Sequence, residues 1–170
     1  MDPSTIIDEL SVRIYQPPLS DIRDSGEIAD PANPLCVLML LIDFRTEIEM
    51  NGISDFIGNS TGLYAAETVV ALDRVGCPAE ADKLRKILAV AASVGMTHDS
   101  IQAERAGQPV YSVTTFRAIH GEKWADACDQ LRTISRSIDF RHIFSRAEEY
   151  VAEHRANFDA ALAMKTESPS

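Results

Sequence analysis

The sequence contains few aromatic residues and few cysteines. Aromatic residues make up 6% of the chain, so the core has to be built mainly from aliphatic side chains. The 3 cysteines lie far apart, with no CxxC pair and no histidine at metal-ligand spacing. This pattern excludes a disulfide scaffold and argues against a cysteine-based metal site. An odd number of scattered cysteines is typical of a reducing compartment, so we expect a cytoplasmic protein.

Long hydrophobic runs are also missing. The longest apolar stretch covers residues 35–42, which is too short to span a bilayer. The N-terminus is acidic and lacks the cationic start of a signal peptide. The chain has 170 residues, of which 45% are hydrophobic, enough for one core. We therefore expect a single domain over residues 1–164, no membrane partner, and a flexible polar tail over residues 165–170.

Basic side chains are outnumbered. There are 16 Lys and Arg against 26 Asp and Glu, which gives a net charge of −10. Such a charge repels phosphate backbones, so direct nucleic-acid binding is not expected. Most of the excess lies in residues 1–60, which contain 11 acids and 3 bases. This asymmetry bears on the choice of partner and not on the fold.

What the sequence does contain is helical periodicity along nearly its whole length. Pro3 opens a first helix that ends before Pro17 and Pro18, and residues 17–34 read as an acidic, proline-rich loop. Pro34 opens a helix to Met50 that is apolar on most sides in its first half, so we expect it to be the central helix.

Turn and cap residues divide the rest of the chain. The further helices that we expect cover residues 53–58, 60–75, 78–94, 97–106, 124–134 and, as one final helix, about 140–164. The β-branched residues 110–115 fit either an extended segment or a helix entry. Because the connections after Gly52 are short, the sequence predicts an all-α fold, a compact bundle of about six to eight helices.

One segment carries a family resemblance. Asn51-Gly52 stops the central helix, Phe56 follows four residues after Gly52, and Asn59 three residues later, before a helix that ends in Gly76. This pattern resembles the DNA-mimic-protein-19-like family over about residues 35–92. The resemblance implies an all-helical domain, and the family's founding member is described as a dimeric, acidic protein that imitates DNA.

The residues of this motif themselves favour a structural role. Gly52 allows the chain to turn after the helix. Phe56 is expected to fill the bundle interior, and Asn59 or Ser60 to cap the next helix. The motif is not acidic, so a DNA-mimic function does not follow from it.

A DNA mimic has to present carboxylates at phosphate-like intervals, and one strand of B-DNA carries a charge about every 3.4 Å. Carboxylates at i and i+4 on a helix start from Cβ atoms about 5–6 Å apart, a sparse imitation of a strand. The candidate surface residues are Glu122, Asp126 and Asp129, then Asp43 with Glu47, and then Asp8, Glu9, Asp21, Asp24, Glu27 and Asp30. For any single one of them, a solvated helix face is the simpler interpretation.

These observations leave three hypotheses. The first, which we favour, is an acidic interaction domain, a DNA mimic in its sharpest form, that occupies the DNA-binding surface of a basic protein such as a transcription factor. The second is a small enzyme or small-molecule binder with a pocket near Asn51, Asn59, Tyr64 and Glu67. The third is a structural dimer module whose charge is solubilising.

No catalytic motif supports the second hypothesis. The 4 histidines form no HExxH pair, and there is no GxSxG, P-loop or GxGxxG pattern. We therefore expect no enzyme activity, no catalytic residue, no metal and no cofactor. The identity of the partner and the oligomeric state, including a homodimer, stay open.

Overall fold

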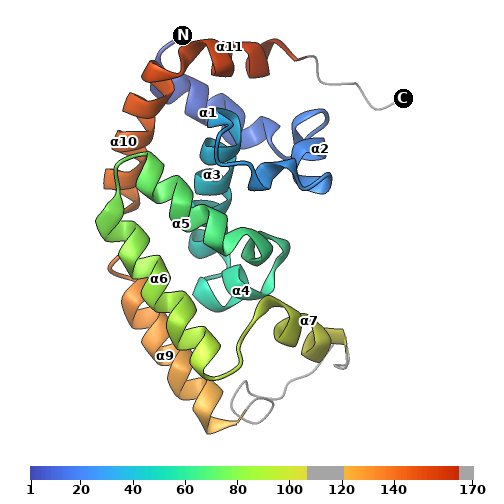
Figure 1. The fold of residues 1–170 in the computed structure, drawn as a ribbon, viewed down its shortest axis with the longest axis vertical. Helices are drawn as coiled ribbons and strands as arrows, with labels where there is room; N and C mark the ends of the chain where they lie inside the picture. Colours follow the sequence, from blue (N-terminus) through green and yellow to red (C-terminus); the bar gives the residue numbers. More distant parts are fainter. Residues whose placement is uncertain (107–120, 165–170) are drawn as a thin grey trace.

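The computed structural model of the chain describes residues 1–106 and 121–164 (Figure 1). Every regular element in these residues is helical, which confirms the all-α prediction. The α-helices are α1 (Pro3–Arg13), α2 (Leu19–Asp24), α3 (Pro34–Met50), α4 (Ile53–Gly58), α5 (Ala65–Arg74), α6 (Pro78–Ser93), α7 (His98–Ala106), α9 (Glu122–Ser135), α10 (Phe140–Glu153) and α11 (Arg155–Ala163). Two short 3₁₀ helices are η1 (Glu27–Ala29) and η2 (Ser60–Tyr64). The predictions for residues 110–115 and 165–170 fall outside the described residues.

Helix α3 is the centre of the bundle. Asn33 caps its N-terminus by accepting a hydrogen bond from the Leu35 N–H at 3.0 Å, and Pro34 occupies the first turn, where its missing N–H costs nothing. All residues from Leu35 to Phe44 are buried. Helices α1, α4, α5, α10 and α11 all contact α3, so the apolar first half that the sequence shows is covered on every side.

Helices α6 and α9 form an antiparallel pair that lies at the opposite end of the molecule from α1 and α11 (Figure 1). The pair is closed at one end by a hydrogen bond from the Trp124 indole N–H to the Val94 carbonyl oxygen, at 2.7 Å. Buried Leu84, Ile87 and Leu131 fill the space between these helices and the rest of the core. The molecule is therefore elongated, with the N-terminal elements at one end and this pair at the other.

The segment of residues 17–34 differs from the expected loop, because it contains α2 and η1. Leu19 and Ile28 are buried at 1% and 0% exposure and anchor the two helices on the core. Gly26 joins them with φ +83°, a left-handed conformation that glycine adopts without steric cost. The prolines and acids of this segment predicted a loop, and Leu19 and Ile28 lie too far apart in the sequence to give a periodic apolar pattern.

The final helix also differs from the prediction, because it breaks at His154 into α10 and α11. No proline or glycine marks this break in the sequence. Packing explains it: α10 lies along α1, whereas α11 turns onto α3 and buries Phe158 and Ala161 there. Tertiary contacts here override a pattern that is periodic in one continuous helix.

Candidate functional site: the acidic segment and the Asn51–Gly62 motif

The two asparagines of the Asn51–Gly62 motif converge on Glu47. The side-chain amides of Asn51 and Asn59 both donate to Glu47 Oε2, at 3.1 and 2.7 Å. Gly52 has φ +85°, and its N–H donates to the Glu47 carbonyl oxygen at 3.0 Å. The motif therefore closes α3 and ties the loop after α4 back to it, which is an architectural role.

Phe56 and Gly62 complete the motif. Phe56 is 1% exposed and its ring meets that of Phe44 edge-on, with centroids 4.9 Å apart, as the sequence analysis expected. Any Cβ at Gly62 would overlap the Ile57 carbonyl oxygen, so only glycine fits this position. The expected cap is absent: Asn59 precedes η2 without a side-chain capping bond, and its amide N–H donates to Glu47.

The polar residues of the alternative pocket hypothesis are mostly bound within the protein. Asn51 and Asn59 bind Glu47, and the Tyr64 hydroxyl donates to the Arg23 carbonyl oxygen at 3.4 Å. Among the described residues, only Glu67 of this set keeps a buried oxygen, Oε2, without a hydrogen-bond partner. The arrangement does not bring catalytic groups together.

Two of the predicted surface carboxylates do not belong to an open acidic face. Asp43 is 5% exposed and binds Arg23, and Glu47 is half-buried against the two motif asparagines. The i, i+4 spacing of Asp43 and Glu47 suggested a surface row. It was wrong because Asp43 lies in the covered half of α3, where it pairs with Arg23, and because Asn51 and Asn59 bind Glu47.

The α9 row lies apart from the other candidates. Glu122, Asp126 and Asp129 are all exposed, but Asp129 is paired with Arg132 at 2.9 Å, and Glu122 and Asp126 also engage in interactions. Helix α9 is at the opposite end of the molecule from α2 (Figure 1). The α9 row and the acidic candidates around α2 therefore do not form one continuous surface.

Four further candidates lie within residues 17–34, which we call the acidic segment. Asp21, Asp24, Glu27 and Asp30 are exposed, and none of them forms an ion pair with any described residue. Asp30 also orders the chain, because its Oδ1 accepts the Ala32 N–H at 2.9 Å. Here uncompensated acid is concentrated over about ten residues of ordered backbone.

Two other N-terminal candidates lie on α1. Asp8 is exposed, whereas Glu9 is half-buried and paired with Arg13 at 3.3 Å. The Arg13 guanidinium also donates to the Leu162 carbonyl oxygen at 2.7 Å and so joins α1 to α11. Glu9 therefore supports this junction, and Asp8 is the α1 residue that stays available.

The carboxylates of the acidic segment affect the pKa of the Cys36 thiol. Cys36 is fully buried and donates to the Glu27 carbonyl oxygen at 3.4 Å. Burial raises the pKa of this thiol to about 11, and the carboxylates of Asp30 and Glu27 add to that rise because they oppose a second negative charge.

The Arg23–Asp43 ion pair lies directly beneath the acidic segment. Arg23 Nη2 approaches Asp43 Oδ1 at 2.7 Å and Oδ2 at 2.6 Å, and Nε approaches Oδ2 at 3.1 Å. The Tyr15 hydroxyl donates to Asp43 Oδ1 at 3.0 Å, and the guanidinium lies 5.1 Å from the Tyr15 ring centroid. Sequence analysis missed this cluster, although a lone Asp inside the apolar run of α3 was a signal for it.

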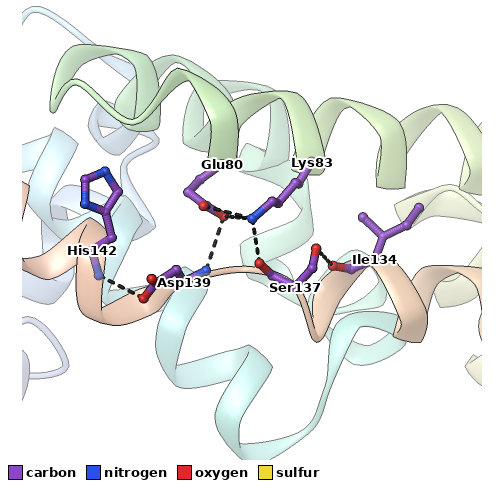
Figure 2. Close-up of polar contacts among 6 residues, drawn as sticks. All are labelled: Glu80, Lys83, Ile134, Ser137, Asp139 and His142. Atoms are coloured by element: carbon purple, nitrogen blue, oxygen red, sulfur yellow. Dashed lines mark hydrogen bonds and ion pairs between the residues drawn. The ribbon is translucent and has the colours of Figure 1, made fainter.

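A second buried carboxylate, Glu80, joins α6 to the turn between α9 and α10. Glu80 accepts hydrogen bonds from Lys83 Nζ at 2.9 and 3.0 Å and from the Asp139 N–H at 3.2 Å (Figure 2). Lys83 in turn donates to the Ser137 carbonyl oxygen at 2.5 Å. The oxygens of Glu80 are engaged by these groups, so the cluster fastens helices together and is not an acid–base site.

Other site classes find no support in the described parts of the chain. No group of three or more His, Cys, Asp or Glu side chains there is placed to bind a metal ion. Nor is any helix of those residues both long enough and apolar enough to cross a membrane. The acidic segment is thus the feature of the described surface that calls for a functional explanation.

The class of this protein is an all-helical bundle. It has a structural Asn-Gly/Phe/Asn motif and an acidic N-terminal surface. Residues 32–154, well over half of the chain, match the family model described as DMP19-like protein. The chain belongs to the DMP19-like protein family, as the motif predicted. No curated protein and no solved structure matches the chain.

Proposed function

We propose that this protein is an acidic interaction domain that binds a basic protein through the acidic segment. In the sharper form of the proposal it is a DNA mimic, and the partner is a DNA-binding protein whose DNA site it occupies. Membership of the DMP19-like family is consistent with this function.

The observation that carries the proposal is that Asp21, Asp24 and Glu27 are exposed and form no ion pair with a described residue. These carboxylates are exposed on the ordered helices α2 and η1, and none is neutralised by a described cation. Elsewhere many acids are matched, for example Asp73 and Asp82 with Arg85, or Asp159 with Arg155. Unpaired charge on one rigid segment gives a directed field, whereas matched pairs give almost none.

The chain offers a matched pair of variants to test this. Asp21→Asn, Asp24→Asn and Glu27→Gln together neutralise the acidic segment while Asp30 keeps its turn bond. The control combines Asp99→Asn, Glu148→Gln and Glu153→Gln, three exposed acids outside the segment. Each variant removes three negative charges, so the two differ only in where the charge is lost.

The assay is calorimetry of each form with purified basic DNA-binding repressors, at low and at physiological salt. We expect the segment variant to lose at least tenfold in affinity, the control to lose less than threefold, and binding to weaken steeply with salt. Duplex DNA carrying the repressor's site should compete with this protein. Equal losses in both variants would mean that the charge is only solubilising, and binding undisturbed by DNA would exclude mimicry.

A further inference from the structure

The acidic segment contains one cation, Arg23, and the fold removes it from the surface. In the sequence, Arg23 stands two residues after Asp21 and immediately before Asp24. A free guanidinium in that position would lie among four carboxylates and would offset one of them. Instead the Arg23 side chain is 17% exposed and points to a partner on α3.

That partner is Asp43, a buried residue that no docking protein can reach. Its carboxylate, 6% exposed, takes the guanidinium through both oxygens. Tyr15 fixes the geometry, because its hydroxyl donates to Asp43 and its ring lies against the guanidinium. A bidentate Arg–carboxylate pair of this kind is directional as well as strong, so the Arg23 side chain has one preferred place.

Holding the segment in place does not depend on this pair alone. Leu19 and Ile28 are buried on either side of Arg23, and the Tyr64 hydroxyl donates to the Arg23 backbone carbonyl oxygen. The backbone of the segment thus has its own anchors. The particular effect of Asp43 is on the Arg23 charge.

From this arrangement we infer that Asp43 is a positioning residue for the acidic surface: it withdraws the only cation of the segment and leaves Asp21, Asp24, Glu27 and Asp30 uncompensated. The inference rests on the proposed function, in which that surface binds a basic partner. The inference adds that the net charge of the acidic segment's surface depends on Asp43, a carboxylate that is not part of that surface.

The test uses four forms of the full chain: wild type, Asp43→Asn, the double variant Arg23→Gln with Asp43→Asn, and Glu80→Gln. The last is the control, because Glu80 is also a buried, ion-paired carboxylate but lies on α6, where it binds the turn between α9 and α10. The probe is a hexalysine peptide titrated at low salt, with binding followed at the backbone amides of residues 19–30 by NMR.

If Asp43 acts by withdrawing charge, Asp43→Asn weakens hexalysine binding about two- to fourfold, the effect of one uncompensated charge near the site in a high-dielectric medium. The double variant restores wild-type affinity, because it removes the cation as well, and Glu80→Gln leaves affinity unchanged. If Asp43 only docks the segment, the double variant stays as weak as Asp43→Asn, which overturns the inference. Unchanged binding in Asp43→Asn overturns it too.

A second readout needs no ligand. The Arg23 Nε–H bonds to Asp43 in the wild type, so we expect it to exchange with solvent at least tenfold more slowly than the Nε–H of exposed Arg136, and to lose this protection in Asp43→Asn. Exchange as fast as that of Arg136 in the wild type would overturn the inference. If these results hold while no DNA-binding protein associates with the chain, the DNA-mimic form of the proposed function fails and the inference stands. If hexalysine causes no shifts at residues 19–30 in the wild type, both fail.

Discussion

Replacing Glu80 by alanine should destabilise the protein more than removing any exposed carboxylate. The Glu80 side chain is 6% exposed and joins α6 to the turn between α9 and α10 (Figure 2). Its removal takes the counter-ion from Lys83 and the acceptor from the Asp139 N–H, at the start of α10. The Asp139 side chain caps α10 by accepting the His142 N–H at 3.0 Å, so the same turn also positions that helix.

The size of the loss follows from these contacts. The hydrogen bond from the Asp139 N–H to Glu80 is only partly buried, so its loss costs about 0.5–1.5 kcal/mol, the net contribution of an ordinary hydrogen bond. The ion pair adds about 0–1 kcal/mol, because Lys83 is 28% exposed and water screens it in part. The total is about 0.5–2.5 kcal/mol, to be compared with the roughly 5–15 kcal/mol that stabilises a domain.

Urea unfolding followed by circular dichroism measures this loss. Glu80→Gln keeps an oxygen acceptor and should lose less than half as much as Glu80→Ala. Glu148→Ala, at an exposed position on α10, is the control and should stay within about 0.5 kcal/mol of the wild type. A Glu80→Ala protein as stable as the Glu148→Ala control would refute the reasoning that this carboxylate fastens the helices.

Three further predictions concern single residues. Gly62→Ala should destabilise the protein far more than Gly95→Ala in the same urea assay, because a Cβ at Gly62 overlaps the Ile57 carbonyl oxygen, whereas Gly95 has φ +73° but open space around it; equal losses would contradict this. Cys36, with a pKa of about 11, should be about one part in a thousand thiolate at pH 8, so Ellman's reagent should react with it only after unfolding; rapid labelling of the native thiol would be the opposite result. Burial raises the pKa of the Asp43 carboxyl, with Arg23 opposing the rise, so the native state holds this proton more tightly than the unfolded chain does. The free energy of unfolding of the wild type, relative to that of Asp43→Asn, should therefore grow as the pH falls from 7 to 4. A difference that shrinks over this range would show that the pKa is lowered instead.

Local signals were enough to predict most of the fold. Pro34 and the Asn51-Gly52 stop define α3, and Gly76 and Pro78 separate α5 from α6. These residues act through their own backbone geometry, which does not depend on distant parts of the chain. The break at His154 had no such signal, since only the packing of α11 on α3 produces it.

The candidate site was harder to predict, because pairing depends on contacts between distant residues. The sequence shows that Asp43 lies within an apolar helix, but not that Arg23, twenty positions earlier, folds onto it. Glu47 looked like the second member of a surface row until the two asparagines of the motif were seen to bind it. The acidic candidates of residues 17–34 are exposed, and the apolar anchors Leu19 and Ile28 of the same segment take the buried positions.

The most direct test of the proposed function is a hydrogen-exchange footprint of this protein in complex with a basic DNA-binding repressor. Residues 19–30 should become protected in the complex, and this protection should vanish when the repressor's DNA site is added in excess. The α6–α9 pair, at the other end of the molecule, should exchange as it does in the free protein. A footprint on α6 and α9 that leaves residues 19–30 unchanged would contradict the proposal that the acidic segment is the binding surface.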